Sequence, residues 1–158
     1  MRKNRERNSS ESFQQCTIDG CFIKTAMVDT DQVRGMMVVA EADFGAVREW
    51  EISAKKEGTH WNALLKITYD VLHLYAEALL LCDCVKAKNH ECLYAYLCEN
   101  YPHLELSWEF FQSLRTMRNR SMYYGRPATY EDWNIVHIPL FIYITTIKKE
   151  VEKRLSST

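Results

Sequence analysis

One stretch of the chain concentrates the side chains best suited to chemistry, from Leu114 to Arg126, with the sequence LRTMRNRSMYYGR. It contains four arginines and no acidic residue, whereas the net charge of the whole chain is -1. A basic cluster in an otherwise acidic body attracts phosphate or carboxylate groups. A guanidinium binds phosphate through two parallel hydrogen bonds, and an aromatic ring can stack on a base. The stretch therefore favours a site for RNA or a nucleotide.

On a helix, these residues separate into two stripes. Arg118 lies on an otherwise apolar side, where a guanidinium must be paired or hydrogen-bonded because its desolvation costs several kcal/mol. Two alternatives follow for Arg118. It lines a ligand site, or it forms an ion pair with Asp70 or Glu77 of the central helix and has a purely structural role. Arg120 points away and is expected to be an exposed charge. The adjoining stripe carries three polar residues at successive spacings of four: Arg115, Asn119 and Tyr123.

The positions of the apolar residues predict an all-α fold. Only five glycines and three prolines are present among 158 residues, which excludes small sandwiches and barrels with many short strands. From Trp61 to Val85, 18 of 25 residues are apolar, so we expect a central helix that is surrounded by protein on most sides. The expected fold is an antiparallel up-and-down bundle of four to five helices, over residues 32–53, 61–85, 90–99, 104–124 and 130–155.

The first 28 residues are expected to lie outside this bundle domain, which spans residues 29–158. Residues 1–15 indicate a flexible tail, and Asp19-Gly20 within 16–24 predicts a small hairpin. Six cysteines are too few and too irregularly spaced for a disulfide scaffold, so reduced core thiols are expected. Because no apolar run is long enough to span a membrane and no secretory leader opens the chain, we expect a soluble, cytoplasmic protein.

Several classes of enzyme and metal site have no signature in this sequence. A phosphate-cradling Gly-rich loop, a GxSxG elbow and an HExxH motif do not occur. The paired Glu-x-x-His motifs of di-iron bundles do not occur either. Cys82 and Cys84 project to different sides of a helix, so the two thiols cannot bind one ion without unwinding it. We therefore expect neither a metal nor a cofactor.

The segment from Arg118 to Gly125, RNRSMYYG, resembles the signature of HEPN domains. In that family an arginine followed by a polar residue, most often asparagine, precedes a histidine by four to six residues. The resemblance covers about residues 32–155, including the long central helix and the Tyr-Pro break that follows 90–99. It implies an antiparallel helical bundle that commonly dimerises, with the arginine motifs of two protomers meeting in a cleft.

The resemblance also implies roles for individual residues. Arg118 matches the motif arginine and Asn119 its polar neighbour, while the histidine position falls on Tyr123 or Tyr124. Arg118, Asn119 and Tyr123 would then form the catalytic group, and the neighbouring ligand-binding side chains would be Arg115, Tyr124 and Arg126. No histidine lies between Arg118 and Gly125. Because tyrosine titrates near 10 and a general base works best with a pKa near 7, the motif favours phosphate binding over turnover.

Three functions stay open at this point. The first is an RNA- or nucleotide-binding domain with a phosphate site around Arg118 and Asn119. The second is an active metal-independent endoribonuclease of toxin type that uses Tyr123 or Tyr124. The third is a non-catalytic helical protein that acts in dimerisation or as an adaptor. Many HEPN domains are endoribonucleases or parts of toxin–antitoxin pairs, so the partners implied are RNA or a nucleotide, a second copy, and an antitoxin or a nucleotidyltransferase.

Overall fold

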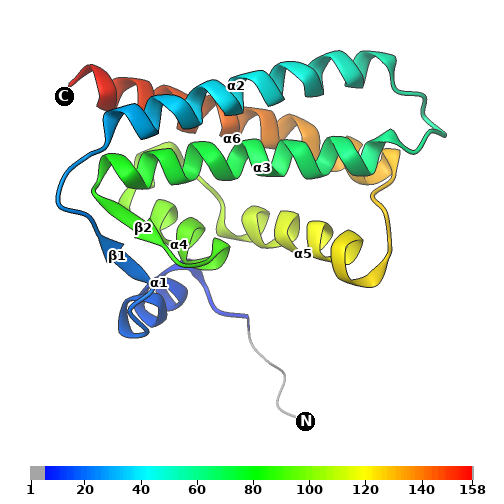
Figure 1. The fold of residues 1–158 in the computed structure, drawn as a ribbon. Coiled ribbons are helices and arrows are strands. Elements are labelled where there is room, and N and C mark those ends of the chain that lie inside the picture. Colours follow the sequence, from blue (N-terminus) through cyan, green and yellow to red (C-terminus); the bar gives the residue numbers. More distant parts are fainter. Residues whose placement is uncertain (1–5, 158) are drawn as a thin grey trace, which may run out of the picture.

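The computed structural model describes residues 6–157 and gives them a helical fold (Figure 1). The all-α class predicted from the sequence is confirmed. Within the described residues, the only sheet is a two-stranded one, and a short 3-10 helix covers Pro102–Leu104. The elements in chain order are α1 Ser9–Ile18, β1 Phe22–Lys24, α2 Thr30–Ser53, α3 His60–Cys82, β2 Val85–Ala87, α4 His90–Asn100, α5 Trp108–Tyr124 and α6 Tyr130–Ser156.

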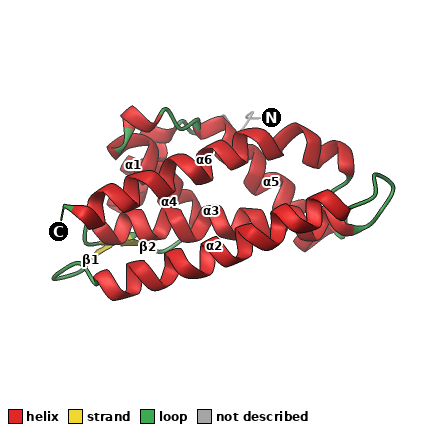
Figure 2. Cartoon of the chain, turned by 90° about the horizontal axis from the view of Figure 1, so that it is seen from above, coloured by secondary structure: helices red, strands yellow, loops and turns green. Residues whose placement is uncertain are grey.

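The helix α3 occupies the centre of the bundle, as its composition predicts. Figure 1 shows α2 and α6 on one side of α3, and α4 and α5 on the other. Most α3 side chains are buried, and among the largest that are fully buried are Tyr69, Leu72 and Leu79. Figure 2, viewed from above, shows the helices α2 and α6 running side by side. The helices α4 and α5 therefore lie together on the side of α3 that is opposite to α2 and α6.

The helix boundaries follow local sequence signals. Thr129 caps α6 in a capping box with Asp132. Asn89 caps α4 by accepting a hydrogen bond from the backbone of Cys92. Gly125 ends α5 in the left-handed region with φ +62°, a conformation that glycine adopts without steric cost.

The expected flexible tail over residues 1–15 is wrong for most of the residues that the structure describes there. Residues 9–18 form α1, which begins with a capping box between Asn8 and Glu11, so this part of the predicted tail is helical. The predicted hairpin is also wrong, because Gly20 only ends α1 and β1 pairs antiparallel with β2, more than 60 residues away. The first five residues of the predicted tail lie outside the described residues. A long-range strand pairing of this kind leaves no local signal in the sequence.

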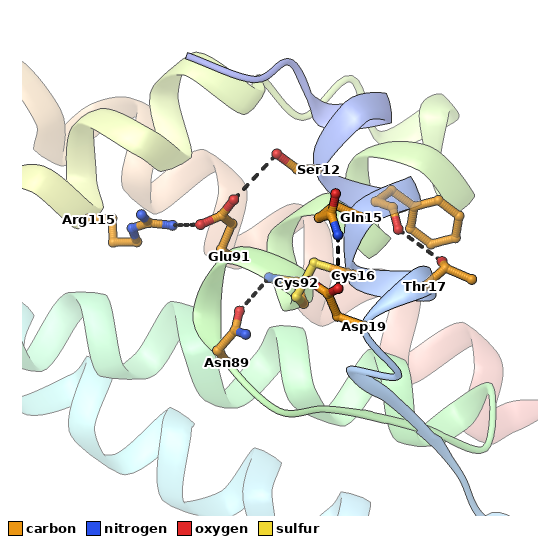
Figure 3. Close-up of a disulfide and its surroundings, with 10 residues drawn as sticks. Ser12, Gln15, Cys16, Thr17, Asp19, Asn89, Glu91, Cys92 and Arg115 are labelled. Atoms are coloured by element: carbon orange, nitrogen blue, oxygen red, sulfur yellow. Dashed lines mark hydrogen bonds and ion pairs between the residues drawn. A yellow bond between two sulfur atoms is a disulfide. The ribbon is translucent and has the colours of Figure 1, made fainter. Parts of the chain in front are cut away.

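A disulfide joins Cys16 of α1 to Cys92 of α4 (Figure 3). The prediction of reduced thiols is therefore wrong for this pair, while the other four cysteines are free: Cys21, Cys82, Cys84 and Cys98. Disulfides are typical of oxidising compartments, so a cytoplasmic location gains no support from this bond. Within residues 6–157, no helix combines the length and the apolar character that crossing a membrane requires.

Candidate anion-binding site

A shallow pocket of about 350 Å³ lies between the first turn of α4 and the second half of α5. It brings together four of the residues nominated by the sequence and adds three from the start of α4. The sequence could not show that these two segments meet, because 24 residues separate Glu91 from Arg115. The lining residues are Asn89, His90, Glu91, Arg115, Arg118, Asn119 and Tyr123.

Arg118 is half-buried and lies over an aromatic ring of the central helix. Its guanidinium carbon is 5.4 Å from the centroid of the Tyr69 ring, which is a cation–π geometry. In the part of the chain that the structure describes, Arg118 forms no ion pair with Asp70 or Glu77, and Glu77 instead lies 3.0 Å from His73. The reading in which Arg118 pairs one of these carboxylates is therefore wrong. Its guanidinium stays available to a ligand.

Arg115 enters the pocket already paired with a carboxylate. Its Nη1 donates to Oε2 of Glu91 at 3.0 Å, and both side chains are about one-third exposed. The other carboxylate oxygen of Glu91 accepts a weak hydrogen bond of 3.4 Å from the hydroxyl of Ser12 in α1 (Figure 3). Glu91 is the one acidic residue among those that line the pocket. It therefore competes with any anion that would bind Arg115.

The remaining predicted residues divide between the pocket and the helix end. Asn119 is half-buried in the pocket lining, and the Tyr123 side chain at its rim is 72% exposed. Tyr124 is 75% exposed and does not line the pocket, and Arg126 follows the turn at Gly125. Arg120 is exposed, as expected, and lies 3.5 Å from Asp132. The structure therefore gathers Arg115, Arg118, Asn119 and Tyr123 but leaves Tyr124 and Arg126 outside.

His90 is the residue of this site that sequence reasoning missed. It is the first residue of α4, and its Nδ1 shares a hydrogen bond of 2.8 Å with the hydroxyl of Tyr69. Its ring stacks on the ring of His73, with centroids 4.0 Å apart. The sequence offers one indirect signal, since His73 and Glu77 are polar residues four positions apart in the mostly apolar helix α3. In the structure both residues belong to a polar cluster with His90.

Burial, together with the nearby charges of His73 and Arg118, lowers the pKa of His90 to about 4. The hydrogen bond from His73 lowers the pKa of Glu77. Burial raises the pKa of the Tyr69 hydroxyl. At neutral pH the site therefore holds an uncharged imidazole beside two guanidinium groups and one carboxylate.

A larger cavity of about 600 Å³ lies between residues 6–8 and α5. It is lined by both signs of charge, with Arg7, Arg120, Glu6 and Glu109 among its residues. Part of its wall is fixed by a hydrogen bond from the indole of Trp108 to the backbone oxygen of Arg7. It contains no histidine, so the smaller pocket offers the more distinctive chemistry.

Comparisons with protein families, with curated proteins and with solved structures find no match to this chain. Among residues 6–157, no three side chains of His, Cys, Asp or Glu are grouped to hold a metal ion. The pocket itself combines guanidinium donors, an amide and an exposed aromatic ring. These groups suit a ligand that carries both a phosphate and a base.

Proposed function

We propose that the protein is an RNA- or nucleotide-binding domain, with its phosphate site between α4 and α5. The observation that carries this proposal is the convergence of Arg115, Arg118 and Asn119 in one pocket. Guanidinium groups bind phosphate oxygens through paired, charge-assisted hydrogen bonds. The resemblance of the segment from Arg118 to Gly125 to the HEPN motif, and with it a HEPN-like bundle, agrees with this assignment.

The proposed binding mode assigns a task to each group. Arg118, held over the Tyr69 ring, binds a phosphate oxygen, and the Asn119 amide adds a neutral donor beside it. Tyr123 offers an exposed ring on which a base can stack. Arg115 contributes fully only when Glu91 releases it. Aromatic stacking favours single-stranded over double-stranded RNA, because the bases of a duplex are not free to stack on a side chain.

The test compares Arg118→Ala with Arg120→Ala in binding to a fluorescent single-stranded RNA. Both variants lose one positive charge from α5, but only Arg118 lines the pocket. We expect Arg118→Ala to weaken binding at least about tenfold and to reduce the salt dependence by about one unit of slope. Its melting temperature should stay within a few degrees of the unaltered protein. Equal effects of the two variants would refute a specific site.

A second function, metal-independent RNA cleavage, is suggested by the position of His90 in the pocket, although its lowered pKa makes it a weaker base than an ordinary histidine. In the tautomer that carries its proton on Nδ1, Nε2 is free to accept the proton of a ribose 2′-hydroxyl. The 2′-oxygen then bonds to phosphorus, and the bond to the 5′-oxygen breaks as that oxygen takes a proton from water. The products are a 2′,3′-cyclic phosphate and a 5′-hydroxyl.

Cleavage is tested with RNA in the presence of EDTA, beside the same sequence with 2′-deoxyribose. His90→Gln should abolish cleavage of RNA and leave binding within about threefold, since glutamine lacks a base but can still hydrogen-bond Tyr69. Tyr123→Phe distinguishes the alternative in which a tyrosine takes the place of the histidine. Binding without cleavage in the unaltered protein would leave the binding domain as the function. Absence of both would favour the adaptor, whose partner would be a second copy, an antitoxin or a nucleotidyltransferase.

A further inference from the structure

Three isoleucines stand exposed in a row on α6. Ile135 is 71% exposed, Ile138 is 60% exposed and Ile142 is 56% exposed. An isolated surface isoleucine is ordinary, but a contiguous row of them favours a surface that a partner covers. Neither the pocket nor its ligand explains this row, because no residue of α6 lines the pocket.

The row belongs to a longer stripe with the spacing of a coiled coil. Six exposed residues follow one another at intervals of four, three, four, three and four, which keeps them on one side of a helix. The opposite side of α6 carries its buried residues, among them Leu140, Ile144 and Ile147. We name the exposed stripe the α6 seam, and its residues are Glu131, Ile135, Ile138, Ile142, Thr145 and Lys149.

We propose that the α6 seam pairs with the α6 seam of a second copy of this chain, antiparallel and about a two-fold axis. The axis passes near the middle of the seam, between Ile138 and Ile142. Each Ile138 then packs against Ile142 of the second copy, and each Ile135 packs against Thr145. The contact is isologous, so it closes as a dimer and does not grow into a filament.

Charge complementarity selects this orientation. The seam ends in an acid, Glu131, and in a base, Lys149, and both are exposed. Among the described residues, neither of them forms an ion pair within its own chain. Antiparallel pairing sets Glu131 against Lys149 of the second copy at both ends. Parallel pairing would instead set Glu131 against Glu131 and Lys149 against Lys149, which is unfavourable.

The surroundings of α6 leave room for a partner. Figure 2 shows α6 along the outside of the bundle, beside α2 and not beneath it. The seam is ~27 Å long, from 18 steps of ~1.5 Å between Glu131 and Lys149. A single pair of helices of that length buries less area than a typical permanent dimer, so we expect a dissociation constant in the micromolar range. The dimer goes beyond the proposed function and does not depend on it.

The first test is sedimentation velocity of the full chain across micromolar concentrations. We expect the mass to double with concentration, and Ile138→Glu to give monomer throughout. The matched control is Ile18→Glu, which adds the same charge at a residue of α1 that is 78% exposed and far from the seam. It should dimerise like the unaltered protein. An unaltered protein that stays monomeric, or an Ile138→Glu variant that still dimerises, overturns the proposal.

A charge exchange tests the orientation without relying on a folded Ile138→Glu variant. Glu131→Lys alone and Lys149→Glu alone each place like charges together and should weaken the dimer at least about threefold. The combined variant restores opposite charges and should regain the affinity of the unaltered protein. A combined variant as weak as the single ones would overturn the antiparallel pairing. Both positions are exposed, so we expect each variant to keep the helical fold, and circular dichroism checks this.

Discussion

The imidazole rings of His73 and His90 stack 4.0 Å apart, although they come from the middle of α3 and the first turn of α4. His73 lies 3.0 Å from Glu77, and His90 shares a hydrogen bond with Tyr69. The stack therefore connects a carboxylate on α3 to the pocket between α4 and α5. A second positive charge in this cluster would be unfavourable, because Arg118 already lies over the Tyr69 ring.

The stability of the fold should fall as the pH drops from about 6.5 to about 4. A histidine in the unfolded chain titrates near 6.5, whereas His90 in the folded chain has a pKa of about 4. Between these values the unfolded state binds a proton that the folded state does not, so unfolding is favoured. The contribution of His90 is complete above about pH 6.5. Urea unfolding at pH 7 and pH 5 measures the difference.

The matched controls for this prediction are His90→Gln and His60→Gln. The first should flatten the pH dependence above pH 5, while the second, at an exposed residue, should leave it unchanged. Glu41 and Glu77 also have lowered pKa values, but carboxylates lose their contribution only at lower pH. Equal slopes for His90→Gln and the unaltered protein would show that the burial of His90 has no such effect.

Removing the carboxylate of Glu91 should tighten phosphate binding. Glu91→Gln keeps the size of the side chain but releases Arg115, which the carboxylate holds at 3.0 Å. A partly exposed ion pair contributes about 0.2–1 kcal/mol, so we expect the affinity for single-stranded RNA to rise up to about fivefold. Fluorescence anisotropy measures the change. The control is Glu109→Gln, on the exposed side of α5, for which we expect a smaller rise in RNA affinity. A Glu91→Gln variant that binds RNA more weakly than the unaltered protein would contradict the competition between Glu91 and the phosphate.

Breaking the disulfide should destabilise the fold by about 2–4 kcal/mol. Cys16→Ser and Cys92→Ser each remove the same bond, so they should cost similar amounts of unfolding free energy. Dithiothreitol should lower the unfolding free energy of the unaltered protein by a similar amount. Cys21→Ser removes a free thiol and should change the unfolding free energy little. Thiol counting by mass spectrometry under denaturing conditions should find four reactive cysteines before reduction and six after.

Two glycines should respond to alanine in opposite directions. Gly125 has φ +62°, which an alanine adopts only at a cost of about 1–2 kcal/mol, although open space surrounds the position. Gly45 lies within α2 with open space around it, and alanine there should stabilise the fold by about 0.5–1 kcal/mol. Thermal unfolding of both variants checks the signs. A stabilised Gly125→Ala variant would contradict the left-handed cap of α5.

The sequence predicts the helices well because their signals are local. Three local signals place helix ends within a few residues of the observed bounds. They are the apolar spacing, the capping box of Thr129 and Asp132, and the break before Pro102. Only the part of the site that lies on α5 can be predicted from local signals in the same way. Arg115, Arg118 and Asn119 share one helix, so their spacing shows that they lie together.

The missed features all depend on contacts between distant segments. His90 joins the pocket because α4 packs beside α5, and β1 pairs with β2 across the whole of α2 and α3. Cys16 meets Cys92 only when α1 lies against α4. The tail prediction fails for a different reason, since the polar α1 buries Ser12 and Cys16 against α4 while most of its other residues are exposed. Composition alone does not distinguish such a short helix from a flexible tail.

The bond between Cys16 and Cys92 also divides the chain mechanically. The two cysteines are 76 positions apart, and the segment between them contains α2 and α3. If the protein is pulled by its two ends, tension passes through the sulfur–sulfur bond and bypasses that segment. Full extension then falls short by ~260 Å, at ~3.4 Å for each bypassed residue. The central helix of the bundle would stay unloaded while α5 and α6 are drawn out.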